Sequence, residues 1–126
     1  MIVTLKNLHE ATAQQVFTQV ATHLLTQKHR SVIYTLDNGE RCAYKGNNGL
    51  MCAAGCLIAD DEYQPAMDAG NVNWYGLRRE GYVGTDSHTD LISDLQYVHD
   101  KIDTKGWEKE LTKVAKSHRL TMPEIN

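Results

Sequence analysis

Apolar residues recur at helical spacing in three parts of the chain. The strongest pattern covers residues 13–27, where an apolar residue returns every three or four positions. Thr12 and Gln15, three residues apart, form the signature of a capping box at its start. Weaker patterns run through residues 91–102 and 107–115, preceded by the potential caps Asp86, Ser87 and Thr104. The sequence therefore predicts three amphipathic helices, and a short fourth one near residues 73–79.

The longest run without a charged residue is residues 49–59, Gly-Leu-Met-Cys-Ala-Ala-Gly-Cys-Leu-Ile-Ala. At helical pitch its leucines and two adjacent alanines share one face, and Cys52 and Cys56 share the opposite face. A helix that is apolar on all sides belongs inside a protein. The run is shorter than the roughly 20 residues that a membrane-spanning helix needs. We therefore expect a buried central helix here.

Two segments rich in β-branched and aromatic residues, 31–36 and 41–44, flank the sequence Asp37-Asn38-Gly39. Asn-Gly between two such segments is typical of a hairpin, because both residues accept the positive φ of a type I′ turn. Residues 1–5 alternate weakly and predict a short edge strand. The predicted fold is α+β: a mostly helical single domain over residues 1–126, with a buried central helix and a small antiparallel β-hairpin.

Composition narrows the class of protein. The chain has 126 residues, of which 41% are hydrophobic and 23% charged, as in one ordinary globular domain. Its net charge of −3 disfavours binding to nucleic acid through phosphate attraction. The first residues do not resemble a signal peptide, and three cysteines are an odd number for a disulfide framework. We expect reduced thiols, a cytoplasmic location in a bacterial cell and no association with a membrane.

Several segments together resemble a family of small proteins encoded by tailed phages and prophages. They are Cys42-Ala43-Tyr44-Lys45-Gly46, Gly49-Leu50, Cys52-Ala53-Ala54-Gly55-Cys56-Leu57-Ile58, Asp60-Asp61-Glu62-Tyr63, Gln14-Gln15-Val16-Phe17 and Leu95-Gln96-Tyr97-Val98-His99-Asp100. The resemblance extends from about residue 12 to residue 120 and is weakest between 64 and 85. It implies an accessory protein that acts in the host cytoplasm, often against host defence or host metabolism.

The three cysteines are the first candidates for chemistry. Cys42, Cys52 and Cys56 could bind a metal ion, with His88 or His99 as a fourth ligand, since zinc takes four nitrogen or sulfur ligands. The three residues between Cys52 and Cys56 would place their sulfurs one helical turn apart, unlike the usual two-residue zinc knuckle. The alternative is that the cysteines are small buried hydrophobic residues.

Thiol catalysis is the second candidate. In the predicted helix, Cys52 would lie in the first turn, where the helix dipole favours a thiolate. His88 or His99 could then act as the base, as in cysteine peptidases. This would make the protein a cysteine- or metal-dependent hydrolase built on Cys52, and ordinary burial of Cys52 is the alternative.

A third group of residues is suited to binding without catalysis. Aromatic residues beside arginines are favoured at interfaces, and a loop rich in glycine and asparagine exposes backbone amides. The predicted binding residues are Tyr44, Lys45, Asn47, Asn48, Trp74, Tyr75, Arg78 and Arg79. Because no catalytic constellation is visible, the sequence favours a binding protein without a cofactor. It would inhibit a host defence protein or sequester a small anionic signal, and self-association into a homo-oligomer stays open.

Overall fold

The computed structural model describes residues 1–36, 39–70 and 72–125 of the chain. The helices are α1 (Ala13–Gln27), α2 (Ala66–Ala69), α3 (Trp74–Arg79), α4 (Thr89–Lys101) and α5 (Trp107–Ser117), and the strands are β1 (Val32–Thr35) and β2 (Gly39–Cys42). Short 3-10 turns connect several of them. This is a mostly helical α+β domain with one antiparallel hairpin, as the sequence predicts.

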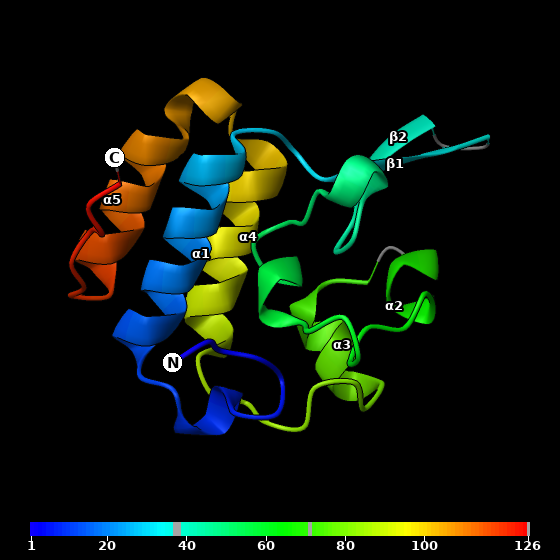
Figure 1. Ribbon diagram of the computed structural model, residues 1–126, viewed down its shortest axis with the longest axis horizontal. Coiled ribbons are helices and arrows are strands. Elements are labelled where there is room, and N and C mark those ends of the chain that lie inside the picture. Colours follow the sequence, from blue (N-terminus) through cyan, green and yellow to red (C-terminus); the bar gives the residue numbers. More distant parts are fainter. Residues whose placement is uncertain (37–38, 71, 126) are drawn as a thin grey trace.

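The three longest helices, α1, α4 and α5, lie side by side and form the helical half of the molecule (Figure 1). Each contributes large side chains to one continuous core, among them Phe17, Leu95 and Trp107, which are almost completely buried. The predicted capping box is present: the Thr12 hydroxyl accepts the amide of Gln15, and the Gln15 side chain accepts the amide of Thr12. Periodicity and capping together located α1 correctly.

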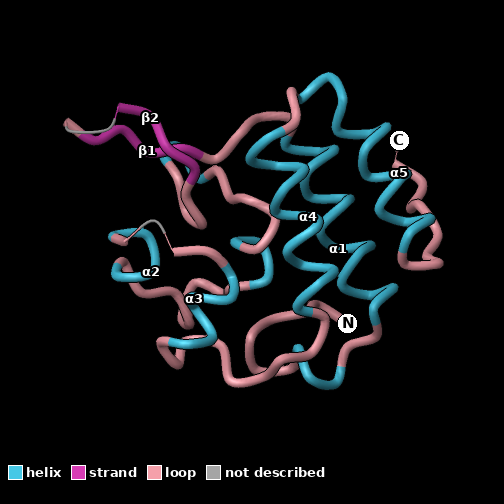
Figure 2. Tube along the Cα trace, turned by 180° about the vertical axis from the view of Figure 1, so that it is seen from behind, coloured by secondary structure: helices cyan, strands magenta, loops and turns pink. Residues whose placement is uncertain are grey.

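The hairpin projects from this helical half, and both views agree on its direction (Figures 1 and 2). Its two strands pair antiparallel, with Val32 opposite Cys42 and Thr35 opposite Gly39. Strands β1 and β2 make their main contacts with each other. The hairpin prediction is confirmed, whereas the predicted type I′ turn depends on Asp37 and Asn38, which lie outside the described residues.

The predicted central helix over residues 49–59 is wrong as secondary structure, although its burial is confirmed. The segment begins on the last residue of the 3-10 turn Asn47–Gly49 and holds one further 3-10 turn, Gly55–Leu57. Cys52, Ala53 and Ala54 are at most 1% exposed. Its backbone amides find partners elsewhere in the chain. Met51 N–H donates to the Gln27 side chain, Cys52 N–H to the Tyr44 carbonyl, and Ala54 N–H to the Gln96 side chain. Because these partners replace the i−4 carbonyls of a helix, the segment folds as a buried irregular chain.

Smaller differences concern ends and edges. Residues 1–5 form no strand. Helix α4 has His88, with a left-handed backbone (φ 62°), at its N-cap, instead of Asp86 or Ser87. Thr104 lies in a 3-10 turn, Thr104–Gly106, that precedes α5. The short helix predicted near residues 73–79 is confirmed as α3, where the Asn73 side chain accepts the Gly76 amide.

Three glutamines of α1 hold three extended segments against the helix. Gln19 accepts the Val3 amide at 2.7 Å and donates to the Val3 carbonyl at 2.9 Å. Gln27 pairs in the same way with both backbone groups of Met51, and Gln14 with both groups of Thr121. A side-chain amide can do this because it carries both an acceptor and donors. We call these three pairings the glutamine clamps.

Among the described helices, none combines the length and the apolar character needed to cross a membrane.

Gly55 is predicted to tolerate no side chain. A Cβ built at this position would lie 2.0 Å from the Tyr44 carbonyl oxygen, which is backbone and has no room to yield. We expect Gly55→Ala to lower the free energy of unfolding by at least about 3 kcal/mol, measured by chemical denaturation. Gly84→Ala is the matched control, because Gly84 is exposed with no atom within 4 Å of the new Cβ, and should change stability by less than about 0.5 kcal/mol. Equal stability of the two variants would contradict the close approach.

The glutamine clamp on Val3 is predicted to stabilise the fold. Val3 is 1% exposed, so Gln19→Ala leaves its amide and carbonyl without these partners in a dry environment. We expect a loss of about 1–3 kcal/mol in the free energy of unfolding, although alanine is the better helix former. Gln64→Ala, at an exposed glutamine, serves as the control and should stay within about 0.5 kcal/mol of the wild type. If both variants are as stable as the wild type, the clamp carries no stability.

Candidate functional site

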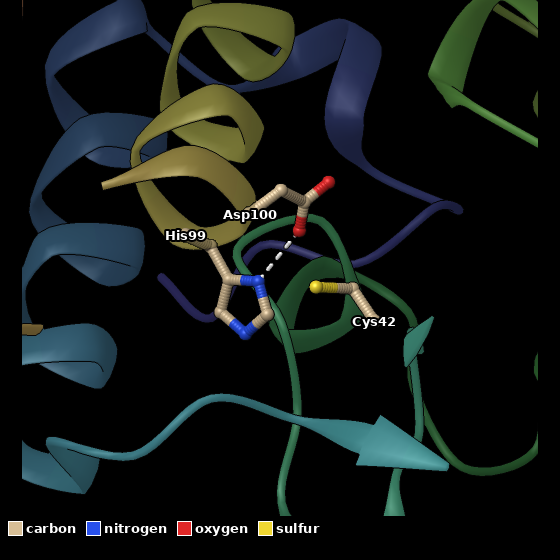
Figure 3. A group of neighbouring side chains, drawn as sticks. All are labelled: Cys42, His99 and Asp100. Carbon is tan, nitrogen blue, oxygen red and sulfur yellow. Dashed lines mark hydrogen bonds and ion pairs between the residues drawn. The ribbon is translucent and has the colours of Figure 1, made fainter. Parts of the chain in front are cut away.

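Cys42, His99 and Asp100 come together where the base of the hairpin meets the last turn of α4 (Figure 3). Their potential ligand atoms all lie within 4.8 Å of one another. Across the described ranges, no other group of three or more histidine, cysteine, aspartate or glutamate side chains lies so close together. It contains one predicted cysteine and one predicted histidine, but neither Cys52 nor Cys56. We call it the Cys-His-Asp cluster.

The protonation of His99 follows from its hydrogen bonds. The ring is fully buried, and its Nε2 lies 2.9 Å from the backbone nitrogen of Ser31. A backbone N–H can only donate, so Nε2 is the unprotonated nitrogen and Nδ1 carries the hydrogen. Nδ1 then donates to Asp100 Oδ1 at 2.7 Å. Both ring nitrogens are therefore engaged, and neither is available to accept a proton from a thiol.

Asp100 is the acceptor that joins this cluster to the rest of the core. Besides the His99 ring it accepts the Gln96 side-chain amide at 2.8 Å, and the sulfur of Cys42 lies within 4.8 Å of it. Gln96 in turn accepts the backbone amide of Ala54 at 2.9 Å. The carboxylate thus links the base of the hairpin, the end of α4 and the buried segment that contains Cys52. A network in which every member has its partners rigidifies a core.

The electrostatics of the three thiols oppose nucleophilic chemistry. Burial raises the pKa of Cys42 to about 12, and the negative charge of Asp100 acts in the same direction. Burial also raises the pKa of Cys56 to about 12, and that of Cys52 still more strongly. The thiolate is the reactive form of cysteine. All three thiols are therefore held in the neutral form at physiological pH, the opposite of an activated nucleophile.

The Cys-His-Asp cluster also fits a metal ion poorly. A histidine that binds a metal normally donates its other N–H to an acceptor. Here Ser31 N–H points at Nε2, so binding a metal through Nδ1 would set two hydrogens against each other. Within the part of the chain that the structure describes, Cys42, Cys52 and Cys56 do not form a cluster of their own. The cluster is built as a hydrogen-bonding centre.

His88 lies elsewhere, at the start of α4, and donates through Nε2 to the Ala11 carbonyl at 2.6 Å. It lines a cleft of about 460 Å³ together with Tyr75 and Arg78, two of the predicted binding residues. The Arg78 Nε atom is buried and meets no hydrogen-bond partner among the described residues. Cys52 lines a different cavity, with Asp68 and Gln96. The predicted pairing of Cys52 with His88 is therefore not formed.

The remaining predicted binding residues divide between core and surface. Tyr44 and Trp74 are 6% and 1% exposed and fill the core beneath the irregular loops, so neither presents its ring on the surface. Lys45 donates to the Ile58 carbonyl at 2.7 Å and is mostly buried. The backbone and side chains of Asn47, Asn48 and Arg79 are exposed.

Sequence reasoning missed Asp100, Ser31 and Gln96 as members of the network. Asp100 follows His99 directly, and both lie with Gln96 in one of the segments that carry the phage-family resemblance. Their spacing from the candidate histidine on one predicted helix, one position for Asp100 and three for Gln96, is a usable signal for both residues. Ser31 had none, because its role is played by the backbone amide, which every residue except proline possesses.

Removing the charge of Asp100 is predicted to make Cys42 more reactive. Burial raises the pKa of Cys42 most and the negative charge of Asp100 raises it further, so Asp100→Asn should lower that pKa. A fall of one unit increases the thiolate fraction about tenfold. We expect alkylation of Cys42 at mildly alkaline pH to become about tenfold faster, followed by mass spectrometry of the labelled peptide.

Cys56 is the internal control for that experiment, because burial and Lys45, and not Asp100, shift its pKa. Its alkylation rate should remain that of the wild type. A parallel rise at both cysteines would indicate general opening of the fold, and an unchanged rate at Cys42 would contradict the coupling to Asp100.

Comparison with protein-family models, curated proteins and solved structures finds no match to this chain. The phage-family resemblance therefore rests on the signature residues alone, and function has to be inferred from the geometry described above.

Proposed function

We propose that this is a phage-type accessory protein that acts by binding a host protein, a defence protein being the class that the sequence resemblance indicates. Binding inhibits the partner by occupying its surface and needs neither a reactive thiol nor a metal ion. The proposal assigns recognition to the projecting hairpin, which lies outside the binding residues that the sequence predicts.

The exposure of the hairpin carries this proposal. Leu36 is fully exposed and Tyr34 is 70% exposed, on a hairpin whose strands contact mainly each other (Figure 1). Tyrosine is enriched among the residues that dominate binding energy, because its large ring is buried on contact while its hydroxyl finds a polar partner. Two large exposed side chains on a projecting element favour a protein partner over a small ligand.

A small anionic signal is less well supported. The cleft that holds Tyr75, Arg78 and His88 is also lined by Asp86 and Asp90, and the Tyr75 hydroxyl donates to Asp90 at 3.0 Å. Two carboxylates offset the charge of Arg78, and an anion would be repelled by both. The hydrolase alternative built on Cys52 is disfavoured because burial raises the pKa of that thiol.

The hairpin is predicted to be required for capture of the partner. Tyr34→Ser combined with Leu36→Ser removes the two exposed side chains and leaves the core untouched. We expect quantitative affinity capture from host-cell extract to fall at least about tenfold for the partner that the wild-type protein retains. Tyr97→Ser, at an aromatic residue 60% exposed on α4, is the matched control and should capture normally.

Undiminished capture by the double variant would contradict recognition through the hairpin. A folded Cys52→Ala variant, tested in parallel, should capture the partner and retain biological activity. Loss of that activity with normal capture would favour the hydrolase instead.

A further inference from the structure

The cleft at the start of α4 carries charges of both signs that do not pair with each other. Its volume of about 460 Å³ is typical of small-molecule sites. Arg78 lines it from the last turn of α3, and Asp86 and Asp90 line it from the segment that leads into α4 and from the first turn of that helix. Across the described ranges, Arg78 forms no ion pair with either carboxylate. We call this surface the charged cleft.

The guanidinium group of Arg78 is positioned by packing and lacks a hydrogen-bonding partner. Its Nε atom is buried and meets no acceptor in the part of the chain that the structure describes. The residue as a whole is only half-buried, so the side chain is still accessible from the cleft that it lines. A guanidinium group is well suited to a carboxylate, because its planar fork donates two parallel hydrogen bonds. Arg78 therefore offers a place for a carboxylate on a ligand.

The beginning of α4 adds a second feature that favours a carboxylate. The N-cap residue His88 forms no side-chain hydrogen bond to the first turn, and its ring donates through Nε2 to the Ala11 carbonyl instead. The first amides of a helix carry a partial positive charge, and Thr89 and Leu91 at this end line the cleft. A helix start without a side-chain cap and an arginine without a partner thus border the same space.

The acidic side of the charged cleft requires a positive group on the same ligand. Asp86 and Asp90 are exposed, and the Tyr75 hydroxyl donates to Asp90 at 3.0 Å, which orients that carboxylate. The His118 ring does not neutralise them, because it donates through Nε2 to Asp94 at 2.7 Å. A ligand with a negative charge alone would be repelled by both carboxylates, whereas an ammonium group would be attracted.

We propose that the charged cleft binds a small zwitterion, an α-amino acid with an apolar side chain. Its carboxylate pairs with Arg78 at the start of α4, and its ammonium group pairs with Asp86 and Asp90. Leu91 and Ala13 supply the apolar part of the lining for the side chain. None of the lining residues belongs to the hairpin, so this site is separate from the proposed function.

The test is calorimetric titration of the full chain with L-leucine, L-valine and L-methionine. We expect saturable binding that depends on both charges of the ligand. The N-acetyl derivative lacks the ammonium group and the amino-acid amide lacks the carboxylate, so each should bind at least about tenfold more weakly than the parent amino acid.

Two variants locate the binding in the cleft. Arg78→Gln and Asp86→Asn each remove one of its charges and should weaken binding at least about tenfold. Their matched controls are Arg79→Gln and Glu80→Gln, at exposed residues of the same charge outside the cleft, which should bind like the wild type. Asp86 is exposed, so Asp86→Asn maintains the test should Arg78→Gln fail to fold.

The proposal is overturned if none of the three amino acids binds, or if either derivative binds as tightly as its parent. Binding that both cleft variants leave unchanged, or that the control variants weaken equally, overturns it as well. The titration involves neither the hairpin nor a host protein. Its failure therefore leaves the proposed function standing, and failure of the capture experiment leaves this site standing.

Discussion

Pairing between side-chain amides and extended backbone is the interaction on which the fold depends. Segments outside helices and sheets must still satisfy their N–H and C=O groups when they are buried. Gln19 does this for the buried Val3 and Gln27 for the half-buried Met51, each with both backbone groups. Gln14 pairs in the same way with the exposed Thr121 and so holds the end of the chain against the helix. Helix α1 therefore organises the chain more directly than the cysteine-rich segment, which packs against it as irregular chain around one 3-10 turn.

Carboxylate side chains also accept backbone amides, outside the bundle of α1, α4 and α5. Glu62 accepts the backbone amides of Leu5, Lys6 and Ala59, and Asp68 accepts those of Tyr44 and Lys45. Gly55 serves the buried backbone by making room for it, since a Cβ at this position would meet the Tyr44 carbonyl. These residues are fixed by the needs of the fold, whereas a function carried by the exposed surface leaves little trace in them.

This distinction also explains what the sequence could predict. Helix α1 and its capping box depend on residues three and four positions apart, and local spacing located both. The segment 49–59 has helical spacing too, but its amides pair with Gln27, Tyr44 and Gln96, contacts that no local pattern encodes. Local spacing does not place Trp74 either, because whether an aromatic ring forms a surface patch or fills the core depends on the path of distant segments. His99 was identified as a candidate, but its tautomer depends on Ser31, 68 residues away in the sequence.

The Cys-His-Asp cluster gains a structural meaning once the hairpin is considered. A two-stranded hairpin alone is marginally stable in water, so its base must be fixed by the domain. Ser31 at that base donates its amide to His99 and its hydroxyl to the Ala43 carbonyl, while the thiol of Cys42 lies within 4.8 Å of Asp100. Arg30, one residue earlier, donates to the carbonyls of His99 and Ile102 at the end of α4. Residues that look catalytic in the sequence thus anchor the hairpin, and in the proposed function a fixed base would reduce the entropy lost on binding a partner.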